Sequence, residues 1–124
     1  MPANKPEDCD LLIAEYLNAG NIDAAVALYE PTATFMAEPG KPATGHAEIR
    51  EVLTAMTAGK PQIGMKVPIV IVNGDIALLV SDYTVAMTGP DGKPASVSAR
   101  GTEVVRRQPD GTWRFIIDNP TGTA

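Results

Sequence analysis

The sequence RGTEVVRRQPDGTWRFIIDNPTG, Arg100–Gly122, has the pattern of a β-hairpin with polar side chains on apolar stripes. A Pro-Asp-Gly turn at 109–111 separates its two strands, because proline fixes φ and glycine accepts a positive φ. Side chains alternate along a strand, so Glu103 shares a face with Gly101 and Val105, and we expect this face to be the core side. A shift of register at Gly101 would instead place Glu103 in solvent.

The returning strand of the hairpin carries a second apolar stripe. Trp113, Phe115 and Ile117 share one face, and Asn119 continues that face by parity. A carboxylate on a core-facing stripe must be paired or have a shifted pKa, so Glu103 indicates a functional site. The Asn119 amide is placed either to hydrogen-bond a ligand or to satisfy the backbone, and both interpretations stay open.

Length and composition indicate one globular domain, residues 1–124, and exclude several classes of partner. Hydrophobic residues make up 44% of the chain and charged residues 20%, and the net charge of −5 argues against nucleic-acid binding. One cysteine and one histidine cannot assemble the usual zinc site, and we expect neither a metal nor a cofactor. The apolar runs Ile69–Val72 and Ile76–Val80 are too short to span a bilayer, so we expect a cytoplasmic protein without a membrane partner.

The first half of the chain has three segments with apolar residues at helical spacing. The first begins near Cys9 and ends at Gly20, and the second runs from Ile22 to a stop at Pro31. The third runs from about residue 45 to residue 59. Three helices are therefore expected before the hydrophobic period changes to two.

Strands are expected between and after these helices. They fall at Thr32–Ala37, Gln62–Val72, Asp75–Met87, Ala95–Gln108 and Thr112–Asp118. Pro68 requires an edge position or a bulge, since proline cannot donate to a sheet ladder. This order predicts an α+β fold, with three N-terminal helices packed in the concave face of a strongly curved, mainly antiparallel sheet that encloses a cavity.

Three segments carry a resemblance to a known superfamily: AGNIDAAVALYEPTATFMAEPGKPATGHAEIREVL (Ala19–Leu53), GDIALLVSDYTV (Gly74–Val85) and the hairpin Arg100–Gly122. In sequence and element order they resemble the nuclear-transport-factor-2-like superfamily, most closely its SnoaL-like, ketosteroid isomerase homologue branch. The resemblance implies a cone-shaped, cystatin-like fold and a homodimer formed through the outer face of the sheet. It does not select a function, because this scaffold hosts isomerases, cyclases, epoxide hydrolases, binding domains and oligomerisation hubs.

The chain departs from the catalytic pattern of ketosteroid isomerases. Those enzymes use a carboxylate base with an oxyanion hole made of a tyrosine and a protonated aspartate, as is established for that family. Here Ile13 stands where the resemblance places the tyrosine, and Tyr16 follows one turn later. The base position falls on Ala37 or Glu38. The candidate catalytic residues are therefore Glu103 by chemistry, Glu38 by position and Tyr16 as a donor.

Four further residues are candidates for ligand binding. Asp82 follows Ile76 and Val80 in parity and would pair with Glu103 if it points inward, although the alternate row of that strand is equally apolar. Asn119, Trp113 and Met56 complete the set, the last two as core side chains or pocket walls.

Three functions are consistent with these residues. The first is a cofactor-independent, isomerase-like enzyme that acts by proton transfer on a small apolar molecule with a carbonyl or epoxide group. The second is a non-catalytic domain that binds a hydrophobic ligand, and the third is a dimerisation domain with a vestigial pocket. Converging carboxyl and hydroxyl groups in an open cavity would favour the enzyme, whereas a filled cavity would favour dimerisation.

Overall fold

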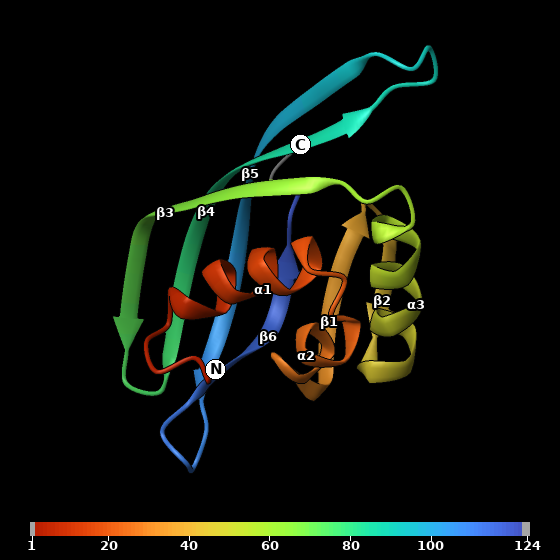
Figure 1. Ribbon diagram of the computed structural model, residues 1–124. Coiled ribbons are helices and arrows are strands. Elements are labelled where there is room, and N and C mark those ends of the chain that lie inside the picture. The colour runs from red at the N-terminus through yellow and green to blue at the C-terminus, as the bar shows by residue number, and fades with distance from the viewer. Residues whose placement is uncertain (1, 123–124) are drawn as a thin grey trace.

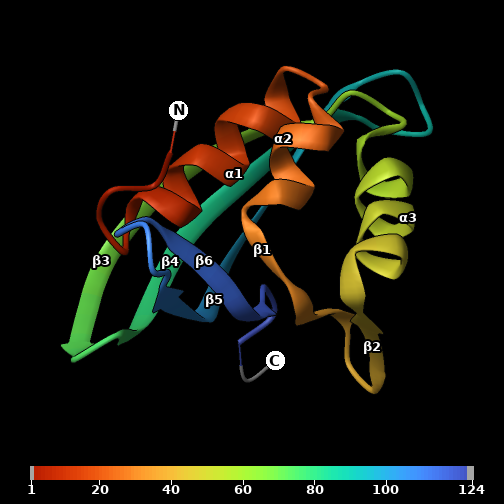
Figure 2. The same cartoon turned by 90° about the horizontal axis from the view of Figure 1, so that it is seen from below.

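Within residues 2–122, which this computed structural model describes, six strands form one curved sheet and three helices cover its concave side (Figure 1, Figure 2). The helices are α1 (Asp8–Asn18), α2 (Ile22–Ala27) and α3 (Gly45–Thr57). The strands are β1 (Tyr29–Glu38), β2 (Lys41–Thr44), β3 (Gln62–Asn73), β4 (Ile76–Thr88), β5 (Pro94–Arg107) and β6 (Trp113–Asn119). The expected fold class is confirmed.

The strand order is β2-β1-β6-β5-β4-β3. Neighbouring strands are antiparallel except β1 and β6, which are parallel. Pro68 lies in β3, which is an edge strand, and the β3–β4 register shifts between Lys66 and Ile69. Both consequences expected of this proline are therefore present.

Two elements differ from the sequence prediction near the start of the sheet. The second helix ends at Ala27, and Tyr29 begins β1, because the Phe115 backbone N–H donates to the Leu28 carbonyl at 2.8 Å and starts the pairing with β6. Strand β2 was not expected in its turn-rich segment. It forms because the chain reverses at Gly40, where φ is +78°, and pairs back onto β1.

The helices enclose the core against the sheet. Helix α1 lies across the concave face and packs against β3 and β6, while α3 packs against β1 and β2 (Figure 1). Tyr29 and Phe115 are fully buried between them, with ring centroids 4.9 Å apart. Among the described residues, no helix is long and apolar enough to cross a membrane.

Strands β4 and β5 keep an unbroken register and therefore strict alternation. Leu79 pairs with Glu103 and Ser81 pairs with Gly101, and all four residues are buried on the concave side. The inward row of β4 is therefore the one that contains Leu79, and Asp82 lies on the outer face. The shift of register that would have exposed Glu103 does not occur.

Strand β6 contains a bulge that reverses its alternation. Val105 pairs with Phe115 and Val104 pairs with Ile117, so Ile116 is an extra residue in the strand. After the bulge, Asp118 faces the core and Ile117 is 47% exposed on the outer face. The expectation that Ile117 and Asn119 continue the inward stripe is therefore wrong, and Asp118 takes the inward position.

Candidate functional site

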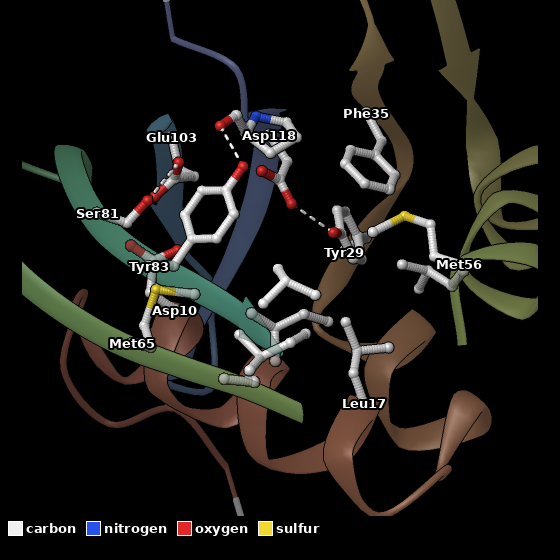
Figure 3. A pocket seen from close by; sticks show the side chains of 16 residues that line it. Asp10, Leu17, Tyr29, Phe35, Met56, Met65, Ser81, Tyr83, Glu103 and Asp118 are labelled. Atoms are coloured by element: carbon white, nitrogen blue, oxygen red, sulfur yellow. Dashed lines mark hydrogen bonds between the residues drawn. The ribbon is translucent and has the colours of Figure 1, made fainter. Parts of the chain in front are cut away.

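A cavity of about 90 Å³ lies between α1 and the concave face of the sheet (Figure 3). Its 16 lining residues come from α1, β1, α3, β3, β4, β5, β6 and the segment after β6. The walls are mainly apolar, and they include Ile13, Leu17, Phe35, Met56, Ile63 and Met65. Six polar side chains converge on it: Asp10, Tyr29, Ser81, Tyr83, Glu103 and Asp118. An apolar cavity with a few convergent polar groups is the usual form of a small-molecule site.

Glu103 occupies the position in the cavity that strand alternation predicts. Its side chain is 2% exposed, and the Ser81 hydroxyl donates to Glu103 Oε2 at 3.2 Å. The carboxyl folds back over Gly101, where an added Cβ would lie 2.6 Å from Glu103 Oε2. The absence of a side chain at Gly101 is therefore a condition for this arrangement.

Asp10 of α1 faces Glu103 and is equally buried, at 2% exposure. Asp10 Oδ2 and Glu103 Oε1 have no hydrogen-bond donor among residues 2–122 if both groups are ionised. Burial raises the pKa of Glu103, and the hydrogen bond and negative charge of Asp10 raise it further. Burial also raises the pKa of Asp10, whereas the hydrogen bond from Glu103 lowers it. Glu103 therefore keeps its proton and supplies the missing donor, and Asp10 ionises first.

Asp118 forms a second acidic centre with Tyr29. The Tyr29 hydroxyl donates to Asp118 Oδ2 at 2.5 Å, and Asp118 is 8% exposed. Burial raises the pKa of Asp118 to about 7, against the lowering effect of the Tyr29 hydrogen bond, and the charge of Asp10 adds to the rise. The Tyr83 hydroxyl lies nearby and donates to the Pro120 carbonyl at 2.7 Å.

The predicted catalytic residues are only partly brought together. Glu103 lines the cavity, but Glu38 lies at the exposed end of β1, where Lys41 Nζ is 3.3 Å from its carboxylate. Tyr16 also lies outside the cavity, because the face of α1 that lines it carries Asp10, Ile13 and Leu17 instead. The expectation that Glu38 and Tyr16 contribute to the cavity is therefore not met.

The predicted ligand-binding residues divide in the same way. Met56 lines the cavity, whereas Trp113 is buried elsewhere beside a surface hollow. Asp82 points outward to Arg100, with 2.6 Å between Oδ1 and Nε, so the predicted Asp82–Glu103 pair is wrong. The Asn119 amide donates to the Gly122 carbonyl at 2.8 Å and serves the backbone.

Sequence reasoning missed Asp10 and Asp118, and the two omissions have different causes. Asp10, Ile13 and Leu17 stand at i, i+3 and i+7, so an acid on an apolar helical stripe was a visible signal. Asp118 had no such signal, because the bulge that turns it inward leaves no mark in the alternation of β6.

The fold and the cavity together define an NTF2-like protein, a class with helices packed into a curved sheet. The SnoaL-like domain family matches residues 12–116, and this chain belongs to that family. No curated protein sequence matches the chain significantly.

Solved structures with low sequence identity share this fold. A ketosteroid isomerase-like protein from Erwinia carotovora atroseptica is 18% identical, with a TM-score of 0.79 over 91% of this chain and 89% of that one. An NTF2-like protein with a cystatin-like fold from Novosphingobium aromaticivorans is 19% identical, with a TM-score of 0.77 over 90% of this chain and 75% of that one. A third structure, from Thiobacillus denitrificans, is described as a proposed calcium/calmodulin-dependent protein kinase type II association domain. It is 20% identical, with a TM-score of 0.78 over 100% of this chain and 98% of that one.

Proposed function

We propose that this protein binds a small, mainly apolar carbonyl compound and isomerises it by proton transfer through Asp10 and Glu103. The observation that carries the proposal is the buried pair itself, in which one carboxyl keeps a proton and the other ionises. Two carboxyl groups with separated pKa values supply an acid and a base at the same pH. The ketosteroid isomerase-like relative shares the fold and supports the reaction class by analogy only.

The proposed reaction needs no group beyond the two carboxyls. Asp10 accepts a proton from the carbon next to the carbonyl, and the electron pair of that C–H bond forms the C–C double bond of an enol. Glu103 transfers its proton to the carbonyl oxygen in the same step. When the substrate carries a C–C double bond one carbon further from the carbonyl, this enol is a conjugated dienol. Asp10 then returns the proton to the far carbon of that double bond, the double bond moves into conjugation with the carbonyl, and the O–H proton returns to Glu103, which restores both groups.

The dimensions of the cavity limit the substrate. Cavities of about 150 Å³ hold benzene, so about 90 Å³ holds a carbonyl group with few carbons. Leu17, Met56, Ile63 and Val85 line both this cavity and an adjoining apolar groove. A longer apolar substituent would therefore extend past these residues into the groove.

Exchange of the α-protons of butan-2-one with D₂O tests the proposed chemistry without the natural substrate. The wild-type protein is expected to accelerate the exchange over buffer, and Asp10→Asn and Glu103→Gln are expected to reduce this acceleration by about 100-fold. Asp82→Asn on the outer face is the matched control and should leave the rate unchanged. Exchange no faster than in buffer, or at the wild-type rate in Glu103→Gln, would contradict the proposal.

The outer face of the sheet supports a second proposal, that two copies associate through it. Ile71 is 56% exposed and Ile117 47% exposed, and register pairs connect them through Leu78 and Val104 into one apolar patch. The ion pairs Arg100–Asp82 and Arg106–Glu30 flank this patch. An apolar centre with a polar rim is the usual anatomy of an interface.

Light scattering of the full chain tests the association. The wild type is expected to be a dimer, and Leu78→Lys in the centre of the patch is expected to be a monomer with an unchanged circular dichroism spectrum. Val97→Lys is the matched control, because Val97 is also apolar and exposed but lies on the inward row of β5. A monomeric wild type would exclude the interface, and with it the dimerisation function.

A further inference from the structure

The hydroxyl groups of the cavity have already used their protons. Tyr29 donates to Asp118, Tyr83 donates to the Pro120 carbonyl, and Ser81 donates to Glu103. A hydroxyl group has one proton to donate and two lone pairs to accept with. These three side chains therefore present acceptor oxygens to a ligand, and the proton of Glu103 is likewise engaged, in the hydrogen bond to Asp10.

The cavity also contains negative charge that nothing in it balances. Asp10, Glu103 and Asp118 are all more than nine-tenths buried, and the one proton of the Asp10–Glu103 pair leaves Asp10 ionised. The lining residues include no lysine, arginine or histidine. The proposed proton transfer uses Asp10 and Glu103, so Asp118 is the acid without an assigned role. A buried carboxylate without a cation is costly, which favours a ligand that supplies one.

We propose that the ligand carries a protonated amine, which binds Asp118 beside the hydroxyl oxygens of Tyr29 and Tyr83. The Asp118 carboxyl lies near both hydroxyls, and Tyr29 occupies Oδ2, which leaves Oδ1 for the ligand (Figure 3). A primary ammonium has three donors, which match this oxygen and the lone pairs of the two phenols. The inference rests on the proposed function, since it takes the same cavity and names the substrate class as a compact amino carbonyl compound.

A hard metal ion fits the corner of the cavity formed by Asp118, Tyr29 and Tyr83 less well than an ammonium group. Besides Asp118, the corner offers two phenol oxygens that already serve as donors elsewhere. Magnesium and calcium take six or more oxygen ligands and retain waters, for which the apolar walls provide no partners. An alkylammonium group, in contrast, places its carbon atoms against those walls.

Three molecules with one carbon skeleton test the inference: butan-2-amine, butan-2-ol and butan-2-one. Binding is measured at about pH 8 by NMR of protein labelled at the methionine methyl groups. Met56 and Met65 line the cavity and should shift on titration, whereas Met36 does not line it and serves as the internal control. The amine is expected to bind about tenfold or more tightly than the alcohol, because it adds charge-assisted hydrogen bonds.

Two variants identify the residues responsible. Asp118→Asn should weaken binding of the amine by about tenfold and change binding of the ketone little. Tyr83→Phe removes one acceptor and should weaken binding of the amine by about threefold. This variant provides the test if Asp118→Asn fails to fold. Asp82→Asn, which changes the acid next to Ser81 on the outer face of β4, should change neither affinity.

The affinity for the amine should also depend on pH. The groups that face Asp118 are Asp10 from α1, Tyr29 from β1, Tyr83 from β4 and Glu103 from β5. Because the pKa of Asp118 is raised to about 7, its carboxylate forms as the pH rises from 6 to 8, and amine affinity should increase over that range. The ammonium itself stays protonated there, and Asp118→Asn should reduce the pH dependence.

The outcomes separate this inference from the proposed reaction. An amine that binds no more tightly than the alcohol, or equally well to Asp118→Asn, overturns the inference, and exchange of ketone protons would still support the proposed reaction. An amine that binds as expected, with no proton exchange in the ketone, supports the cation site and contradicts the reaction. Failure of all three molecules to shift Met56 and Met65 overturns both.

Discussion

The two faces of strands β4 to β6 depart from ordinary burial in opposite directions. On the concave face, Glu103 and Asp118 are buried acids in an apolar cavity. On the outer face of the same strands, Leu78 and Ile117 are apolar and exposed. A single exposed aliphatic residue carries no information, but a buried acid or a connected apolar patch does. The comparison therefore indicates a ligand site on one face and an interface on the other.

Replacement of one residue on each face of β6 gives the largest expected difference in the free energy of unfolding. Phe115→Ala should lower the free energy of unfolding by about 3–5 kcal/mol, because Phe115 is fully buried against Tyr29 and leaves a cavity. Ile117→Ala, two residues further on but beyond the bulge, should cost less than about 1 kcal/mol within one chain. Urea unfolding measures both, and equal losses would contradict the assignment of faces.

The acids of the concave face should make stability depend on pH. The folded-state pKa of Asp118 is raised, so its contribution is complete below the ordinary pKa near 4 and is lost as the pH rises through about 7. Asp118→Asn remains neutral and should gain about 2–4 kcal/mol over the wild type between pH 4 and pH 8. Urea unfolding at several pH values measures the difference. A constant difference between the two proteins would show that Asp118 is ionised at acidic pH in the folded state.

Gly101 connects the geometry of β5 to the acid pair, and its substitution should have an intermediate effect. A Cβ at this position would meet Glu103 Oε2 at 2.6 Å and Ser81 Oγ at 2.9 Å, so Gly101→Ala should cost about 1–3 kcal/mol. Gly59→Ala is the matched control, since nothing lies within 4 Å of its Cβ and its φ is not positive. Thermal and urea unfolding compare the pair, and an equally small effect at both glycines would mean that Glu103 does not fold back over Gly101.

The smallest effect is expected for an acid on the outer face. Asp82 is exposed and paired with Arg100, and this guanidinium holds the pKa of Asp82 below its usual value. Solvent and salt screen such a pair, so Asp82→Asn should leave the unfolding free energy almost unchanged, and any difference should vanish at high ionic strength. A large loss that persists in salt would mean that Asp82 is part of a buried network.

The alternation of a strand predicts a site only where the register is regular. The sequence of β5 alone predicts that Glu103 faces the core. This prediction holds because β4 and β5 pair without interruption from Ile76 to Thr88. In β6 the extra residue Ile116 reverses the alternation of side chains. Regular alternation predicts that Asn119 faces the core, but the structure has Asp118 in that position. The helix spacings located α1 and α3, but the resemblance drew attention to Tyr16 instead of Asp10. A bulge depends on pairing between distant segments, and one strand read alone does not contain that information.

The direct measurement of the central claim is a carboxyl ¹³C NMR titration of Asp10, Glu103 and Asp118 in the wild-type protein. The claim is that the cavity holds an acid pair with one proton at neutral pH. Glu103 Cδ is expected to keep the chemical shift of a protonated carboxyl through pH 7, while Asp10 ionises at lower pH than Glu103. A Glu103 signal that titrates near the ordinary value of 4.5 would contradict the claim.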